Sequence, residues 1–269
     1  MKANYHTHTY RCHHASGSDE EYVLAAIENG YEILGFSDHG CWNYERKDFV
    51  SRIRMDKEQF DDYYRSIAFL KEKYKDKIEI KIGMEFEYFP KYMGWLKAFL
   101  QEKPLDYILF GNHYYQSDEY GLYYGMICHD DAWLSRYVDD CIAGLSTGLY
   151  SYLAHPDLFM RSRPCFDEMA YVESVRLCTW CKEHDILLEY NLEGARIQDA
   201  YKRDGSYPCR AFWEVASSVG CSAILGVDAH HPDSLRTDQY RNEGLSRLKA
   251  LGMNVVDQIP YPLKTQEIS

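Results

Sequence analysis

The chain has 269 residues, with 30 Lys and Arg against 42 Asp and Glu, so its formal net charge is −12. Because 46% of the residues are hydrophobic and 15% are aromatic, the chain can bury a large core, which excludes wholesale disorder. The acidic balance argues against binding of long nucleic acid or anionic membranes through an electropositive surface. It does not exclude a small phosphate ester as substrate, since metal ions or a few arginines can supply local positive charge.

The N-terminus and the cysteines predict a cytoplasmic location without a membrane partner. Residues 1–6 lack the apolar stretch of a secretory signal, and no segment approaches the roughly 18–20 apolar residues that span a bilayer. The nine cysteines are scattered, which favours a reducing compartment over a disulfide framework. The CxxC pair Cys178 and Cys181 falls within a helical pattern, so we interpret it as two thiols on a helix.

Strand-like and helix-like segments alternate in the first half of the chain. A short strand at residues 2–5 precedes a capping box, Ser18 with Glu21, which opens a helix that ends near Gly30. A buried strand at 33–37 and a long amphipathic helix at 55–75 follow. We then expect a strand at 78–86, a helix at 92–100 and a strand at 107–110.

The alternation continues to the end of the chain. We expect a helix at 133–145, a strand at 152–154, a helix at 166–183 and a strand at 186–190, then a helix opened by Pro208 that runs to Val219. A strand at 222–227 and a helix at 242–251 close the series. About seven strands alternating with helices predict a parallel sheet in one domain, residues 1–269. At this length a closed α/β barrel is the leading architecture, and a doubly wound open sheet is the alternative.

Residue types that bind metals stand at the ends of six of these strands. His6 and His8 end the first strand, and because alternate residues share one face of a strand, both imidazoles can reach one metal. Glu85 ends the third strand. The other candidates are His14 in the loop after the first strand, and His39, His113, His155, Asp228 and His230 at later strand ends. Barrel enzymes build their sites at this end of the strands, so one shared metal site explains the joint pattern.

The motifs that contain these residues follow one another in a recognisable order. They are His6-Thr7-His8-Thr9, Arg11-Cys12-His13-His14-Ala15, Ser37-Asp38-His39, Gly83-Met84-Glu85, Gly111-Asn112-His113, Leu153-Ala154-His155-Pro156-Asp157-Leu158 and Gly226-Val227-Asp228-Ala229-His230. Over nearly the whole chain they resemble the polymerase-and-histidinol-phosphatase (PHP) family of metallo-phosphoesterases. Within that family the chain is most similar to the stand-alone histidinol-phosphatase type.

This resemblance implies a distorted (β/α)7 TIM-like barrel that holds two or three divalent ions at the C-terminal ends of its strands. The implied metal ligands are His6, His8, His14, His39, Glu85, His113, His155, Asp228 and His230. Glu85 would bridge two ions, and Glu85, Asp228 and His230 are the expected catalytic residues. His14 is preferred to His13 because it precedes Ala15, as the family's ligand precedes a small residue. His129 and His231 lie outside the motifs, and His231 is a candidate substrate contact.

The chemistry of these residues agrees with the resemblance. A nitrogen-rich set of seven histidines and two carboxylates suits Zn, Fe or Mn better than Mg or Ca. Closely spaced ions activate a shared water and neutralise charge during phosphoryl transfer. Arg161 and Arg196 are the expected phosphate contacts, and Arg163 is a further candidate, since a guanidinium binds phosphate bidentately. Arg196 resembles a family phosphate contact, but Leu192 and Glu193 depart from the small residues that usually precede the glycine there.

We therefore expect a phosphatase for a small phosphate monoester, with L-histidinol phosphate, a substrate of histidine biosynthesis, as the first candidate. One alternative is the same site acting on nucleotides or short nucleic-acid ends. A metal-dependent amidohydrolase is disfavoured, because His113 stands where that family expects a lysine or carboxylate bridge. A non-catalytic metal-binding protein is disfavoured because no position of the ligand set is missing. The sequence predicts no oligomeric state.

Overall fold

Seven parallel strands and nine α-helices form the part of the chain that the computed structural model describes, residues 1–202 and 205–259. The strands are β1 Ala3–Asn4, β2 Ile33–Phe36, β3 Glu79–Phe86, β4 Tyr107–Phe110, β5 Leu188–Asn191, β6 Ser222–Gly226 and β7 Asn254–Val256. The helices are α1 Asp19–Glu28, α2 Phe60–Lys73, α3 Met93–Glu102, α4 Tyr124–Ile127, α5 Asp131–Leu145, α6 Glu168–Glu183, α7 Leu192–Tyr201, α8 Arg210–Val219 and α9 Gln239–Ala250. Short 3₁₀ helices lie at Tyr10–Cys12, Lys57–Gln59, Pro90–Tyr92, Asp118–Tyr120, Leu158–Arg161 and Pro232–Leu235.

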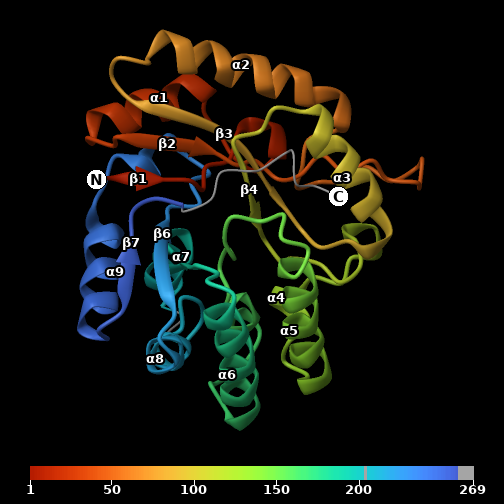
Figure 1. Cartoon of the computed structure of the whole chain (residues 1–269), viewed down its shortest axis with the longest axis vertical. Coiled ribbons are helices and arrows are strands. Elements are labelled where there is room, and N and C mark those ends of the chain that lie inside the picture. Colours follow the sequence, from red (N-terminus) through yellow and green to blue (C-terminus); the bar gives the residue numbers. More distant parts are fainter. Residues whose placement is uncertain (203–204, 260–269) are drawn as a thin grey trace.

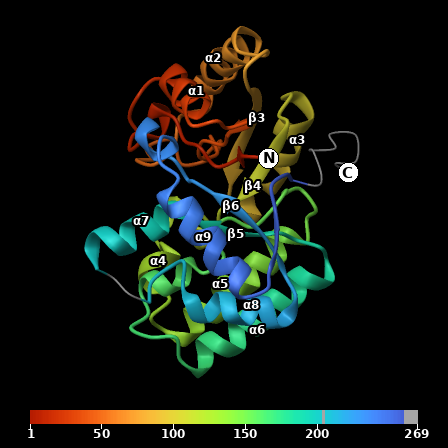
Figure 2. The same cartoon turned by 90° about the vertical axis from the view of Figure 1, so that its left-hand side faces the viewer.

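The strands form two parallel sheets, β1-β2-β3-β4 and β5-β6-β7. Single backbone bridges join them: Leu153 pairs with Phe110 at the end of β4 and with Leu188 at the start of β5, and Thr7 pairs with Ala229 beyond β6. Helices α1 and α2 cover one end of the molecule, and α5, α6 and α8 lie at the other (Figures 1 and 2). The predicted α/β fold is therefore confirmed as a curled parallel sheet surrounded by helices.

The strands differ from the prediction at two places. The strand predicted at 152–154 is only an isolated bridge at Leu153, because the backbone turns away at once into His155, whose φ is +31°. The seventh strand of the structure, β7, was not predicted. The seven-stranded closed barrel thus stays a prediction, although seven strands are present.

An apolar cluster lies among the strands, separate from the larger core between the sheet and the helices. Its members are Ala3, Tyr5, Ile33, Tyr107, Leu109, Tyr152, Ala154, Leu187 and Ile224. The Tyr107 hydroxyl donates to the backbone oxygens of Tyr5 (2.6 Å) and Phe36 (3.0 Å), and Gly83 leaves room for its ring. These apolar side chains fill the interior between the strands. The polar residues that follow the strands therefore lie at the C-terminal ends, outside this cluster.

The helices follow the predicted pattern closely. The capping box of α1 is present, since Ser18 Oγ accepts from the backbone N–H of Glu21, and the Glu21 carboxylate accepts from the backbone N–H of Ser18. In α2 the buried residues are Phe60, Tyr63, Ile67 and Leu70, one face of the amphipathic helix. Helices α4 and α7 were not predicted, and α8 begins at Arg210 instead of Pro208.

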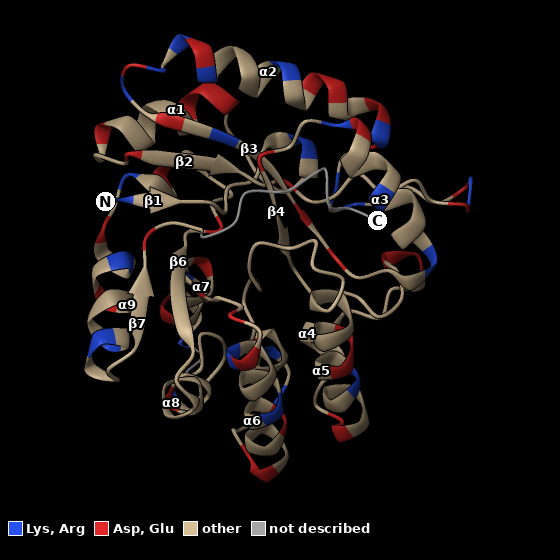
Figure 3. Cartoon of the chain, in the orientation of Figure 1, with Lys and Arg blue, Asp and Glu red and all other residues tan. Residues whose placement is uncertain are grey.

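Charges of both signs are mixed on the outer helices. Figure 3 shows basic and acidic residues interspersed along α2 and α9. Among residues 1–202 and 205–259, no helix is long and apolar enough to cross a membrane. The last ten residues of the predicted domain lie outside the described residues.

Candidate metal centre

The nine predicted ligand residues converge at the C-terminal ends of the strands. Glu85 lies near the centre: its carboxylate oxygens are 2.9 Å from His39 Nδ1, 3.0 Å from His155 Nε2 and 3.5 Å from both His6 Nε2 and His113 Nε2. A side chain at Gly111 would place its Cβ 2.1 Å from Glu85 Oε1, so that glycine makes room for the carboxylate. The third strand therefore supplies one carboxylate within reach of four imidazoles.

Asp228 is a second carboxylate of the cluster, and it approaches the same His6 nitrogen as Glu85. Its Oδ1 atom lies 2.9 Å from His8 Nε2 and 3.4 Å from His6 Nε2, and its Oδ2 atom accepts from Asn191 Nδ2 at 3.0 Å. The residue has a φ of +52°, a conformation that L-residues rarely adopt. Such strain persists at functional sites when the surrounding structure holds it in place.

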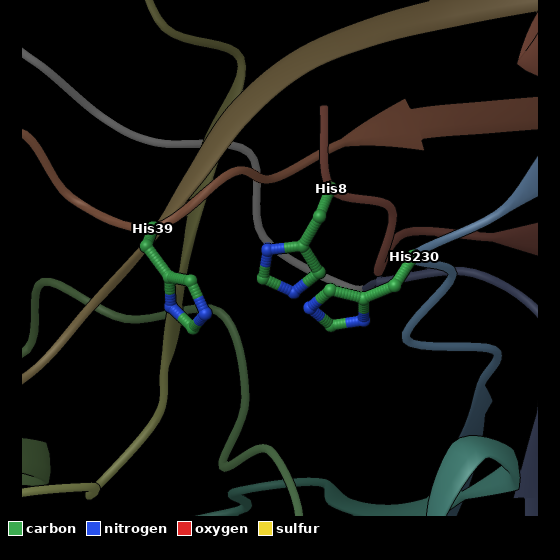
Figure 4. A group of neighbouring side chains, drawn as sticks. All are labelled: His8, His39 and His230. Atoms are coloured by element: carbon green, nitrogen blue, oxygen red, sulfur yellow. The ribbon is translucent and has the colours of Figure 1, made fainter. Parts of the chain in front are cut away.

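Several imidazole rings face one another. His14 Nε2 lies 3.0 Å from His230 Nε2, and His113 Nε2 lies 3.2 Å from His155 Nε2. Figure 4 shows that the rings of His8 and His230 lie close together, with His39 facing them, and these three residues come from segments far apart in the sequence.

Second hydrogen bonds fix which nitrogen of each ring is free. The Nδ1–H groups of His14 and His230 donate to the backbone oxygens of Cys12 (2.7 Å) and Asp228 (2.9 Å). The Nε2 atoms of these rings then carry lone pairs that point at each other, an arrangement that a shared cation relieves. His13, whose φ is +67°, is the exposed C-cap of a 3₁₀ helix, so the structure brings His14 and not His13 to the cluster.

Buried polar atoms that make no well-oriented hydrogen bond, although some lie within 3 Å of a neighbouring ligand atom, gather at this cluster. Among the described residues they include His6 Nε2, both ring nitrogens of His8, His39 Nδ1, Glu85 Oε2, His155 Nδ1 and Asp228 Oδ1. Buried polar atoms are nearly always satisfied, so orphaned donors and acceptors concentrated in one place call for a missing partner. Nitrogen and carboxylate donors in this number fit divalent cations of the Zn, Fe or Mn type.

Three carboxylates that the sequence analysis did not single out as site residues lie beside the Nδ1 atoms of the histidines. Glu189 on β5 accepts from His6 Nδ1 at 2.8 Å and from the backbone N–H of His155 at 3.1 Å. Glu87 accepts from His113 Nδ1 at 3.0 Å, and Asp38 lies 3.5 Å from His8 Nδ1. Carboxylates in this position orient a ligating imidazole and raise its basicity.

The charges of the cluster shift its pKa values strongly. Burial alone would raise the pKa of Glu85, but His113, His6 and His39 lower it well below its usual range. Asp228 behaves in the same way: burial opposes the change, but the pKa falls well below normal because of His6, His8 and His230. Both carboxylates are therefore ionised at neutral pH.

The histidines divide into two groups. Burial, reinforced by the charge of His8, lowers the pKa of His230 to about 3 and that of His39 well below normal. Burial would also lower the pKa values of His6 and His8, but Asp228 and the other carboxylates beside them raise both well above normal. Such displaced values within one cluster are typical of functional sites.

A cavity of about 750 Å³ opens over the cluster, and its lining contains both predicted phosphate contacts. Arg161 donates to the hydroxyl of Tyr123 at 3.2 Å, whereas Arg196 is paired with Glu193 at 2.5 Å. Arg163 does not line the cavity: its buried guanidinium contacts Asp131 (2.9 Å) and Asp167, so the suggestion that it binds phosphate is wrong.

The remaining singled-out residues have ordinary structural positions. His231 is half-exposed at the edge of the cavity, where its Nδ1 atom accepts from the backbone N–H of Asp233. His129 is exposed and donates to the backbone oxygen of Met126. Cys178 and Cys181 are buried on α6 as free thiols, which agrees with their interpretation as two thiols on a helix.

Comparison with known proteins identifies the family of the chain. The PHP domain matches residues 4–193 of the chain. The chain belongs to the PHP domain family.

Two relatives match the chain in sequence. A protein of Deinococcus radiodurans named "Probable histidinol-phosphatase" is 25% identical over 236 residues, 84% of this chain and 85% of that protein. The histidinol-phosphatase of Lactococcus lactis is 28% identical over 115 residues, so this match spans only 42% of the chain and 39% of that protein.

A crystal structure of a Lactococcus lactis histidinol phosphate phosphatase, in complex with Zn, L-histidinol and phosphate, superposes with a TM-score of 0.71. It has 20% sequence identity over 95% of both chains. A solved structure from Listeria monocytogenes gives a TM-score of 0.73 at 21% identity, over 90% of this chain and 99% of that one. These likenesses support one fold over nearly the whole chain.

Proposed function

We propose that the chain is a metal-dependent phosphoric monoester hydrolase that converts L-histidinol phosphate into L-histidinol and phosphate. The observation that carries the proposal is the cluster of orphaned imidazole and carboxylate atoms beneath a cavity that also contains Arg161. Membership of the PHP domain family and the likeness to proteins named as histidinol-phosphatases favour this substrate over other monoesters.

The nine residues His6, His8, His14, His39, Glu85, His113, His155, Asp228 and His230 would hold two or three divalent ions. Zn, Fe and Mn are the candidates that suit the donor set. Ions held there would supply an activated water and neutralise charge on the phosphoryl oxygens.

The residues of the chain have distinct tasks in this proposal. Glu85 and Asp228 are ionised and hold the ligand cluster together, since each reaches at least two histidines. His230 binds through a neutral ring, because its pKa of about 3 prevents it from donating a proton at neutral pH. Arg161, in the lining of the cavity, binds the phosphate.

The barrel and the location complete the proposal. The bridges at Leu153 and between Thr7 and Ala229 support closure of the strands into a seven-stranded barrel of a single domain. Nine unpaired thiols suit the reducing cytoplasm.

Purified protein tests the proposal directly. We expect two or three Zn, Fe or Mn ions per chain, and the highest kcat/KM for histidinol phosphate in a panel with nucleotides, sugar phosphates and a short single-stranded DNA. A preference for nucleotides or DNA ends would favour the alternative phosphoesterase. Bound metal without turnover of any member would point to a non-catalytic metal-binding protein, and full activity without metal would refute the mechanism.

A further inference from the structure

A carboxylate outside the proposed ligand set lies in the wall of the cavity. Glu193 is in the first turn of α7, and its side chain is only 14% exposed. Its two oxygens accept from Arg196 Nη2 at 2.5 Å and Nε at 2.7 Å, a bidentate pair one helical turn apart. Asp233 also lines the cavity, but it is 68% exposed and pairs with Arg236. Outside the proposed ligand set, Glu193 is therefore the largely buried acid in the described lining of this cavity that a substrate can reach.

The two arginines of the cavity differ in how they are paired. Arg196 is neutralised by Glu193, whereas Arg161 has no carboxylate partner among the residues that the structure describes. Instead, Arg161 donates to the Tyr123 hydroxyl, and its guanidinium lies 5.5 Å from the centre of the Tyr123 ring. A phosphate group therefore meets an uncompensated cation at Arg161 and a compensated one at Arg196.

Drawing Arg196 toward the phosphate has a consequence for Glu193. A carboxylate in a largely buried position loses much of its solvation, so it is costly to leave ionised without a partner. Burial raises the pKa of Glu193, and the nearby charge of Asp228 acts in the same direction, while Arg196 opposes both. A substrate that recruits Arg196 therefore binds better if it also brings a cation for Glu193.

We propose that Glu193 is a specificity-determining residue that accepts the ammonium group of a zwitterionic phosphate monoester. This inference rests on the proposed phosphatase function and deepens it. The site then binds both charged groups of the substrate: Arg161 binds the phosphate dianion, and Glu193 binds the ammonium group. Neutral alcohol phosphates, such as sugar phosphates, satisfy only the first contact.

The test compares two esters that differ in one amino group, histidinol phosphate and its deaminated analogue 3-(imidazol-4-yl)propyl phosphate. We expect the wild-type, metal-loaded enzyme to favour the amine by roughly tenfold to hundredfold in kcat/KM, the range of one charge-assisted hydrogen bond. In Glu193→Gln we expect this ratio to fall toward one, because KM rises for the ester that carries the amino group. In Arg196→Gln the ratio is at least retained, because Glu193 then lacks its arginine partner and gains more from the cation of the substrate.

Glu214→Gln is the matched control, because it removes an acid from an exposed pair with Arg210 on α8, outside the cavity lining. Its ratio should equal that of the wild type, and thermal melting verifies that each variant is folded. Equal rates on both esters for the wild type, or an unchanged ratio in Glu193→Gln, would overturn the inference while leaving the phosphatase intact. If the wild type hydrolyses no monoester at all, the proposed function fails and the inference fails with it.

Discussion

At the scale of single residues, hydrogen bonds to buried carboxylates orient histidines of the cluster for metal binding. His6 and His113 each donate Nδ1–H to a buried carboxylate, Glu189 or Glu87. Each ring is thereby held in one orientation, with Nε2 turned toward the cluster. The geometry of the site therefore depends on residues that touch neither metal nor substrate.

Replacement of Glu189 tests this dependence. In Glu189→Gln an NH2 group replaces one carboxylate oxygen, and only one acceptor oxygen remains. That oxygen cannot accept from His6 Nδ1–H and also from the donors on the other side, His155 N–H and Asn191 Nδ2. We expect metal affinity or kcat to fall about 10–100-fold. Metal titration and steady-state kinetics measure the loss, and Glu72→Gln on the exposed face of α2 is the control. Wild-type affinity and rate in Glu189→Gln would contradict the positioning role.

Metal binding should also release protons. Burial opposes protonation of His6 and His8, but the adjacent carboxylates raise their pKa values well above normal, so these two rings carry protons in the metal-free chain at neutral pH. A metal must displace those protons, and its apparent affinity therefore falls as pH falls.

Calorimetry measures this release. At pH 7 we expect on the order of two protons released per chain when Zn binds. Titrations in two buffers of different ionisation enthalpy give the number, since the observed heat then differs in proportion to the protons transferred. Heats that are identical in both buffers would rule out displacement of histidine protons.

At the scale of elements, the long segment between β2 and α2 is tied to the site by Arg54. This fully buried guanidinium donates to both oxygens of Glu87, at 2.7 and 2.8 Å, and to Asp118 at 3.0 Å. Glu87 in turn holds His113. A largely irregular segment thus reaches the ligand cluster through the contacts of Arg54 with Glu87 and of Glu87 with His113.

We expect Arg54→Ala to destabilise the protein by about 3–5 kcal/mol, because it leaves two buried carboxylates without their cation. The rate should fall as well, since Glu87 loses the partner that positions it against His113. Denaturant unfolding and steady-state kinetics measure the two effects. Arg46→Ala, in an exposed pair with Asp48 on the same segment, should change neither. Equal stability of the two variants would refute this account.

Most elements could be predicted because each carries its own signal. The box Ser18–Glu21 and the apolar face of α2 are local patterns, and the structure confirms both. Helix α7 was missed because it starts at Leu192, directly after β5 ends at Asn191, and Gly194 interrupts its helical pattern. Strand β7 was missed because it has only three residues, Asn254–Val256, too few to show an alternating pattern.

The residues of the site also differ in whether the local sequence or a contact with a distant residue reveals their role. The convergence of the proposed ligand residues could be predicted, because most of them follow strand ends and the ends of parallel strands meet. Glu189 could not be predicted, because its partner His6 lies 183 positions away and the run Leu188–Asn191 looks like an ordinary buried strand. The pairing of Arg196 with Glu193 was equally hidden, since it depends on the unpredicted helix α7.

At the scale of the whole molecule, the proposed ligands come from segments spread between residues 6 and 230. Ions bound to them stabilise only the folded chain, by about 4 kcal/mol when free metal exceeds the dissociation constant 1,000-fold. We expect chelation to lower the melting temperature by roughly 10 °C and readdition of Zn to restore it. Calorimetric melts of both forms provide the measurement. An unchanged melting temperature after verified metal removal would mean that the cluster does not hold the fold together.

The bridge between Thr7 and Ala229 carries a consequence for the order of events during synthesis. His8 N–H donates to the backbone oxygen of Ala229 at 2.9 Å, and Ala229 N–H donates to that of His6 at 3.1 Å. His6 and His8 are synthesised about 220 residues before Asp228 and His230. Contacts of such long range form slowly. A nascent or truncated chain therefore cannot assemble the full ligand set, and complete metal loading reports that translation has passed residue 230.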